Sequence, residues 1–517
     1  MIPGPRFGAQ TWIAPAHASN PSRTGVYRRR DVVACLALTA LVVPVAVSAQ
    51  DRVTEFAAGG TPDALDVSGP EELRAALARA RGGEVILLAP GDYGSLELRG
   101  TRAKFDDPVT LRSADPAVPA RFDRIALRGA RNLVLERLEF RYRPEAGDGK
   151  LRAMLEVRGA GKDSAGDITV RDCRFVGELV SARVGADLLD AEAVAAKKGL
   201  VAGSYAGMGI YMQGAEDITV TGNEVTGVYR GFSFEKIARL EVSENLVHDI
   251  RSDGMTFGQL EHARIERNTV RDLHPWRHSQ AQNKGDHPDL MQFWTTNSDA
   301  ATRDVVVRGN LLVQRAAVDG DRAQGIFMRN SKAEADAATD EFFFRDIVIE
   351  DNVILNGHIN SLVIGETIGL AVVGNLVLQD PGAGTDRIDT PILSIARRSA
   401  EVTVSGNVLP ALSLDYSTVR GYAPLDEGAA LGWQVAGNSF TRRDPAEGTV
   451  IGEDGAALYH EDKVIAELDA AMSGPPRSAA GSLAQEITVP GRGNIASRAT
   501  CTRSEDGASR EVGAGCL

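Results

Sequence analysis

A short phrase that recurs along the chain constrains its fold more than any other feature. Each copy holds two apolar residues one residue apart, then two variable residues and an Asn, as in Ile-Thr-Val-Thr-Gly-Asn at 218–223. Copies end at Asn223, Asn245, Asn268, Asn310, Asn352 and Asn375, with weaker copies at Asn407 and Asn438 and with Leu138 and Cys173 at the Asn position of the earliest ones. Three steps are 22 or 23 residues, and two are 42, which is one repeat plus an insertion or two repeats.

A period near 22 residues, carried by strands, is typical of a stacked solenoid. Low aromatic content (5%) and 54 Gly suit strands and turns better than helices. The Leu pattern of leucine-rich repeats is absent. We therefore predict an all-β chain that forms a right-handed parallel β-helix. Its coils should stack about 4.8 Å apart, with equivalent Asn side chains hydrogen-bonded in an internal ladder.

A second strand in each coil sets the expected register. Apolar pairs one residue apart recur at 210/212, 232/234, 255/257, 291/293, 326/328 and 362/364. Strand side chains alternate in direction, so these pairs should point into the coil and their neighbours outward. The expected outward residues are Tyr211, Gln213, Ser233, Glu235, Thr256, Gln292, Trp294, Phe327 and Arg329, with Arg230, Asp253, Asp289 and Gln324 before the strands and Lys236, Gln259 and Asn330 after them. This polar and aromatic column would suit a chain of sugars.

The sequence outside the repeat predicts the remaining organisation. Residues 1–49 read as an N-terminal extension and signal peptide, with an Arg triplet, an apolar run and a small-residue cleavage site ending at Ala49. A lead-in at 50–66 precedes the β-helix domain at 67–441, which begins with an N-terminal capping helix. Residues 442–517 are expected to form a C-terminal cap, with a helix at 461–472, and a tail in which Cys501 and Cys516 pair as a disulfide.

The net charge of the chain and its N-terminal targeting segment limit the kinds of partner that the protein can bind. Removal of residues 1–49, which carry five Arg and one Asp, changes the formal net charge from −13 to −17. Such a surface argues against nucleic acid as a partner. No later apolar run is long enough for a membrane span. We expect a secreted or periplasmic monomer, and an anionic substrate would need cations supplied locally by its site.

The stretch 284–294 is the strongest candidate for the site, because it holds two carboxylates, a His, a Lys and a Trp. His287 is the candidate base, since an imidazole titrates near neutrality. Asp286 or Asp289 would orient it. Arg329, two coils further on, could hold a substrate carboxylate in a bidentate fork.

Further residues complete the predicted site. Lys284 and Lys236 are alternative cations or bases, and Tyr211 is a candidate acid. The residues expected to bind substrate are Tyr211, Gln213, Gln259, Trp276, Asp286, Gln292, Trp294 and Asn330.

Residues 65–140 resemble the N-terminal part of the chondroitinase B-like and alginate lyase β-helix enzymes. The resemblance lies in the helix that follows Ser68 and in the segments 82–93, 108–114 and 133–140. It implies a pectate lyase-like solenoid that acts on an acidic polysaccharide, and it leaves open a requirement for Ca²⁺, whose ligands the sequence does not identify. Asp286-His287-Pro288-Asp289 is similar to a rearranged Asp-Pro-His motif of mannuronan C5-epimerases, which implies His287 as base and Asp289 as its partner.

Four functions remain open at this point. A lyase that cleaves a uronic-acid-containing polysaccharide by β-elimination fits best. A C5-epimerase removes the same proton. A glycoside hydrolase of the polygalacturonase type would use Asp253, Asp286 and Asp289, which are expected on neighbouring coils. A non-catalytic β-helix would bind the glycan without changing it.

Overall fold

The computed structural model describes residues 64–141, 153–160, 164–178, 207–275, 286–315, 322–453, 455 and 457–472. The expected signal peptide, Trp276, Lys284, Cys501 and Cys516 lie outside the described residues, so these predictions stay predictions. Among the described residues, no helix has the length and apolar character needed to cross a membrane.

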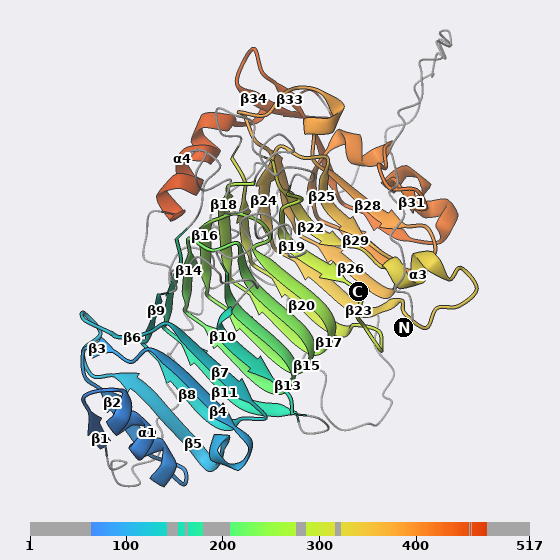
Figure 1. Ribbon diagram of the computed structural model, residues 1–517. Coiled ribbons are helices and arrows are strands. Elements are labelled where there is room, and N and C mark those ends of the chain that lie inside the picture. The colour runs from blue at the N-terminus through green and yellow to red at the C-terminus, as the bar shows by residue number, and fades with distance from the viewer. Residues whose placement is uncertain are drawn as a thin grey trace, which may run out of the picture. The chain divides into compact units, whose positions relative to one another are not determined.

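Strands stack in parallel to form a β-helix with three faces (Figure 1). The first face contains β4 (Ser95–Arg99), β7 (Arg124–Arg128), β10 (Ala153–Arg158), the first halves of β13 (Met208–Thr221), β15 (Arg230–Ser243) and β17 (Met255–Glu266), then β19 (Asp289–Trp294), β22 (Gln324–Met328), β25 (Asn360–Ile364), β28 (Ile392–Ala396) and the antiparallel β31 (Tyr422–Ala423).

The second face continues from the same long strands after a tight corner. It contains β1 (Ala64–Val67), β2 (Val85–Leu88), β5 (Lys104–Ser113), β8 (Arg131–Glu136), β11 (Ala165–Arg171), the second halves of β13, β15 and β17, then β20 (Arg303–Arg308), β23 (Phe344–Glu350), β26 (Thr367–Val373), β29 (Ala400–Ser405) and β32 (Gln434–Ala436).

The third face is a separate sheet. Its strands are β3 (Gly91–Asp92), β6 (Ala120–Phe122), β9 (Glu139–Arg141), β12 (Arg174–Val176), β14 (Glu224–Thr226), β16 (Leu246–Ile250), β18 (Thr269–Leu273), β21 (Leu311–Val313), β24 (Val353–Asn356), β27 (Leu376–Gln379), β30 (Val408–Pro410) and β33 (Ser439–Asp444), followed by the antiparallel β34 (Thr449–Gly452) and β35 (Ala457–His460).

Among the described residues the helices are few and short. They are α1 (Pro70–Arg79), α3 (Ser331–Ala335) and α4 (Glu461–Met472), with 3₁₀ turns η1 (Gly100–Ala103), η3 (Arg387–Asp389), η4 (Ala411–Leu414) and η5 (Leu425–Leu431). Helix α1 buries Leu73 and Leu77 at the N-terminal end of the core. Helix α4 packs Val464 and Leu468 against outward apolar residues of the third face.

The expected Asn ladder runs through the interior. Each Asn Nδ2 donates to the Oδ1 of the next ladder Asn at 2.8–3.0 Å, from Asn223 through Asn245 and onward to Asn438. Cys173 occupies the preceding ladder position, where its backbone N–H donates to Asn223 Oδ1. β20 pairs directly with β17 and β23, so each 42-residue step is one coil plus an insertion.

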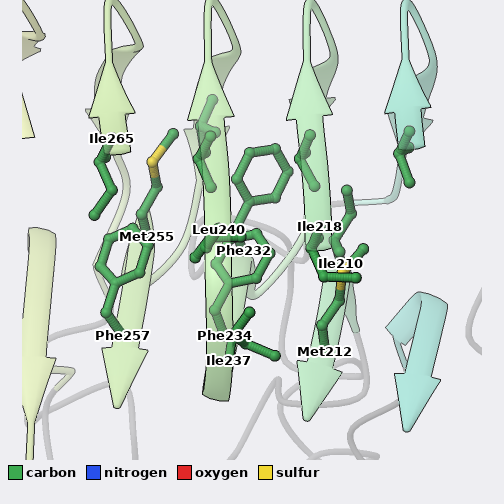
Figure 2. Close-up of a cluster of buried hydrophobic side chains, with 14 of the residues drawn as sticks. Ile210, Met212, Ile218, Phe232, Phe234, Ile237, Leu240, Met255, Phe257 and Ile265 are labelled. Atoms are coloured by element: carbon green, nitrogen blue, oxygen red, sulfur yellow. The ribbon is translucent and has the colours of Figure 1, made fainter. Parts of the chain in front are cut away.

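Core packing follows the predicted register. Phe232 and Phe234 pair with Met255 and Phe257 on the next strand, and all four are buried. Figure 2 shows these side chains between the strands together with those of neighbouring coils. The Phe257 ring stacks on Phe293 at 4.8 Å between centroids. The right-handed parallel β-helix predicted from the repeat is thereby confirmed.

Candidate functional site

The first face presents one outward residue per coil in strict register. Tyr211 pairs with Ser233, Ser233 with Thr256, Thr256 with Gln292, Gln292 with Phe327, Phe327 with Val363 and Val363 with Ser394. We name this series the outward column. Its members lie about 4.8 Å apart, as neighbouring strands do.

A second series lies at the corner where these strands begin and consists of Arg230, Asp253, Asp289 and Gln324, which we name the corner row. Arg230 Nε lies 2.9 Å from Asp253 Oδ2. The backbone N–H of Asp289 donates to Asp253 Oδ1 at 3.3 Å, and Asp289 pairs in register with Gln324. The parallel stacking of coils therefore places two carboxyl groups, one cation and one amide side by side.

His287 lies above the corner row and is open to solvent. Its side chain is 70% exposed, whereas that of Asp289 is fully buried, and their closest atoms, Nδ1 and Oδ2, are 3.9 Å apart. Gln324 Nε2 lies 2.8 Å from His287 Nδ1. Either orientation of the Gln324 amide serves the ring, since its nitrogen can donate to a neutral imidazole and its oxygen can accept from a ring N–H.

Burial and charge shift the proton equilibria of this pair. Desolvation, reinforced by nearby Asp253, raises the pKa of Asp289 to about 7. Interaction with Asp289 is the main cause that raises the pKa of His287 above its usual value. Both shifts favour the protonated form of the group concerned. Gln292 Nε2 holds Asp289 Oδ2 at 2.6 Å, so the carboxyl group cannot swing away.

Asp286 has a different role from the one considered for it. Its carboxylate accepts two hydrogen bonds from Arg251, at 2.7 Å from Nε and 3.0 Å from a terminal nitrogen. Both side chains are only 1% exposed. This bidentate pair anchors the backbone next to His287, so the carboxylate that faces the imidazole is that of Asp289.

Arg230 is the cation of the corner row. Its side chain is 25% exposed, and its guanidinium lies 5.4 Å from the centre of the Tyr229 ring and 5.9 Å from that of Trp294. The sequence placed Arg230 among the outward residues but did not select it for the site. The apolar-x-apolar register that begins at Phe232, two residues later, was the signal that could have done so.

Trp294 leans over the neighbouring strand, where it pairs in register with Gly258. A Cβ atom at position 258 would lie 2.6 Å from the indole Nε1. Gly258 is therefore needed for the observed position of the indole. Aromatic faces of this kind are suited to stacking against sugars or cations.

Other predicted residues are engaged elsewhere. β22 pairs directly with β19, so Arg329 lies one coil from Trp294 and not two, and its guanidinium forms a fork with Glu334 at 2.8–3.2 Å. Lys236 pairs with Asp299. In this structure each of these two cations is therefore engaged with a carboxylate.

Two predicted substrate-binding amides have structural partners. Asn330 is fully buried and caps α3 by accepting from the Ala333 backbone N–H at 3.1 Å. Gln259 accepts from the backbone N–H of Asp299 at 2.6 Å. Asn330 is thus a buried helix cap in this structure, and its contact with substrate stays a prediction.

Tyr211 and Gln213 belong to a polar network further along the first face. The Tyr211 hydroxyl donates to Glu235 at 3.2 Å, Gln213 Nε2 donates to the same carboxylate at 2.9 Å, and Arg158 lies 4.6 Å from the centre of the Tyr211 ring. Burial raises the pKa of Tyr211 to about 12. Three strand spacings, roughly 14 Å, separate Tyr211 from Gln292. Tyr211 is therefore too distant to act as acid on the bond that His287 would attack.

Acidic side chains do not form a metal-binding cluster among the described residues. No group of three or more His, Cys, Asp or Glu side chains among them is arranged to hold a metal ion. Asp253 and Asp286 already face Arg230 and Arg251. A cavity of about 670 Å³ lies elsewhere, lined by residues of β27, η3, η4, β33 and α4, and it includes no member of the outward column or corner row.

Comparison with protein-family models and with curated protein sequences gave no match. Among solved structures, the PL6 family alginate lyase AlyGC matches with 13% identity over 75% of this chain and a TM-score of 0.31, and the chain spans only 55% of its length. The Azotobacter vinelandii mannuronan C-5 epimerase AlgE4 A-module matches with 13% identity and a TM-score of 0.31, over 66% of this chain and 84% of that chain. The Streptococcus pneumoniae surface adhesin PfbA matches with 10% identity and a TM-score of 0.36, over 69% of this chain and 90% of that chain. Similarity at this level assigns no activity to the chain.

Proposed function

We propose that the protein is a lyase that cleaves a uronic-acid-containing polysaccharide by β-elimination, with His287 as the base. The supporting observation is the exposed imidazole of His287, set 3.9 Å from the buried carboxyl group of Asp289 and beside Gln324. An accessible base beside a buried carboxyl group that can orient it suits proton abstraction. The Arg-rich extension and apolar run at 28–47 support action outside the cytoplasm.

The proposed β-elimination needs no oxidant, reductant or other co-reactant. His287 removes the proton from C5 of the uronate, and the electron pair of that C–H bond forms the C4=C5 double bond. The C4–O bond breaks, and the departing oxygen receives a proton from the imidazolium or from water. Arg230 is the cation that would neutralise the substrate carboxylate and so make the C5 proton more acidic.

Burial of the carboxyl groups weighs against hydrolysis. A glycoside hydrolase needs two carboxyl groups that reach the glycosidic bond. The side chains of Asp253, Asp286 and Asp289 are 3%, 1% and 0% exposed, and each is directed at a protein partner. The His287 side chain, in contrast to these three carboxyl groups, is accessible to a glycan.

One incubation with a panel of polyuronates distinguishes the reaction classes. The proposal predicts ultraviolet absorbance from the new double bond, in step with new reducing ends. Reducing ends without absorbance would indicate a hydrolase, and solvent deuterium at C5 without cleavage would indicate an epimerase. Retention of the glycan without any chemical change would indicate a binding module.

A further inference from the structure

The outward column changes character on the C-terminal side of the His287 coil. Gln292 is followed in register by Phe327, then Val363, then Ser394. Phe327 is 9% exposed, and Val363 and Ser394 are fully buried. Large apolar side chains that point outward from a β-helix lose their exposure only where another part of the chain covers them.

The cover is the segment 411–423, which we name the wall. Its strand β31 pairs antiparallel with β28, joining Tyr422 to Ala396. Figure 1 shows β31 beside β28 at the orange end of the first face. The Tyr422 side chain packs on Phe327 and Val363 in a buried apolar cluster, with Val419 against it.

A second contact fastens the wall beside the corner row. The Thr418 hydroxyl donates to Asn360 Oδ1 at 2.6 Å. Asn360 is the residue that follows Gln324 in register, because Ile326 pairs with Leu362. The wall therefore spans both series, the outward column at Val363 and the corner row at Asn360. Val363 lies only two strand spacings, roughly 10 Å, from Gln292.

The opposite direction along the first face carries, among the described residues of the outward column, no large apolar side chain. Thr256 and Ser233, the next two members of the outward column, are small, polar and buried. Beyond them Tyr211 and Gln213 are half-buried polar residues, and the Arg158 side chain beside them is 36% exposed. Tyr211 and Gln213 donate to Glu235, and Arg158 donates to Gln213 Oε1 at 2.6 Å, so this polar network spans three successive coils. A long linear ligand can extend over these coils, whereas the wall stops it on the other side.

We infer that the wall ends the glycan-binding surface one short step beyond His287, so that the protein acts on chain ends and releases a short product. The inference rests on the proposed function. It assigns specificity to Tyr422, Thr418 and Val419, none of which touches the His287–Asp289 pair in any described contact.

The test uses the full chain and oligouronates that carry a bulky fluorophore on either the reducing or the non-reducing end. Binding is followed by fluorescence anisotropy. We expect one tagged series to bind at least about tenfold more weakly than the other, a difference of about 1.4 kcal/mol, because its fluorophore would collide with the wall. The double variant Thr418→Ala/Tyr422→Ala should reduce that difference to less than about threefold.

Tyr416→Ala is the matched control, because Tyr416 lies in the same segment but its ring packs against Arg387 at 4.1 Å. This variant should keep the wild-type difference between the two series. Equal binding of both series to the wild-type protein would overturn the role of the wall, even if the double variant did not fold. Failure of every oligouronate to bind would overturn the proposed substrate class, and the wall's role with it.

Discussion

At the scale of single residues, the site combines a solvent-accessible imidazole with a buried carboxyl group that raises its pKa. His287 is exposed, and its partner Asp289 is buried and held by Gln292. The sequence could predict both members of this pair, because they lie two residues apart in a stretch rich in ionisable groups. It placed Arg230 among the outward residues but did not select it for the site, because its position beside Asp253 depends on the stacking of separate coils.

The raised pKa of His287 sets the pH dependence of the proposed reaction. The base must be neutral, so the rate should rise with pH through a value above 6.5. Asp289→Asn removes the interaction that is the main cause of this shift, so the rising limb should move to lower pH and kcat should fall roughly 10-fold or more. Steady-state rates measured between acid and alkaline pH test this, with Asp299→Asn, a surface change, as control. If the rising part of the pH–rate profile of Asp289→Asn lay at the wild-type pH, Asp289 would not be the cause of the raised pKa of His287.

Asp289 should also make stability depend on pH. Its pKa is about 7 in the folded protein, above its value in an unfolded chain, so folding favours the protonated form. The contribution is present in acid and is lost as pH rises toward and through 7. Asp289→Asn lacks this loss, so its unfolding free energy relative to wild type should increase with pH, by on the order of 2–4 kcal/mol. Chemical unfolding at pH 5 and pH 8 provides the comparison, and a constant difference would contradict it.

At the scale of elements, the repeating unit is a strand, a left-handed corner and a ladder Asn. The residue before each ladder position has a positive φ, for example Gly222, Glu244 and Gly309. The sequence predicted the ladder because its Asn residues recur at regular steps. It did not resolve the 42-residue steps, since insertions of variable length carry no periodic signal.

Substitution of a ladder Asn should cost more stability in the interior of the ladder than at its end. Asn310→Ala removes the acceptor for the backbone N–H and Nδ2 of Asn268 and the donor to the Ile265 carbonyl, all buried. The cost should be about 3 kcal/mol or more, since each stranded buried group costs about 1–3 kcal/mol. Asn438→Ala, at the half-buried end of the ladder, should cost about 1 kcal/mol because water can replace the lost partner. Equal midpoints for the two variants in urea would argue against the ladder as a source of stability.

A side chain added at a left-handed corner should cost less stability than the loss of a ladder Asn. Gly309 has φ of 61°, and a Cβ there would meet nothing closer than Arg267 Cγ at 3.7 Å. Gly309→Ala should therefore destabilise by about 1 kcal/mol through its backbone alone. Glu244→Ala, at an equivalent corner that already carries a side chain, should change stability by less than about 0.5 kcal/mol. Thermal unfolding of both variants compares them, and no loss in Gly309→Ala would contradict the strain argument.

At the scale of the whole molecule, the β-helix orders side chains from distant parts of the sequence into straight series. Parallel pairing brings Tyr211, Thr256 and Gln292 into one column. The sequence predicted this register, since alternation of apolar residues determines which side chains point out. It did not predict the wall, although outward apolar residues such as Phe327 and Val363 were the available sign that something covers them.

The central claim is that His287 abstracts a proton from a uronate, and the most direct measurement compares the wild-type protein with His287→Ala on a polyuronate that the wild-type protein cleaves. Initial rates of ultraviolet absorbance are the readout, with His262→Ala as the control, because His262 is an exposed His on β17 that pairs with Asp304. The account predicts a loss of about 100-fold or more for His287→Ala and wild-type rates for His262→Ala, with all three proteins unfolding at the same temperature. Full turnover by His287→Ala would contradict it.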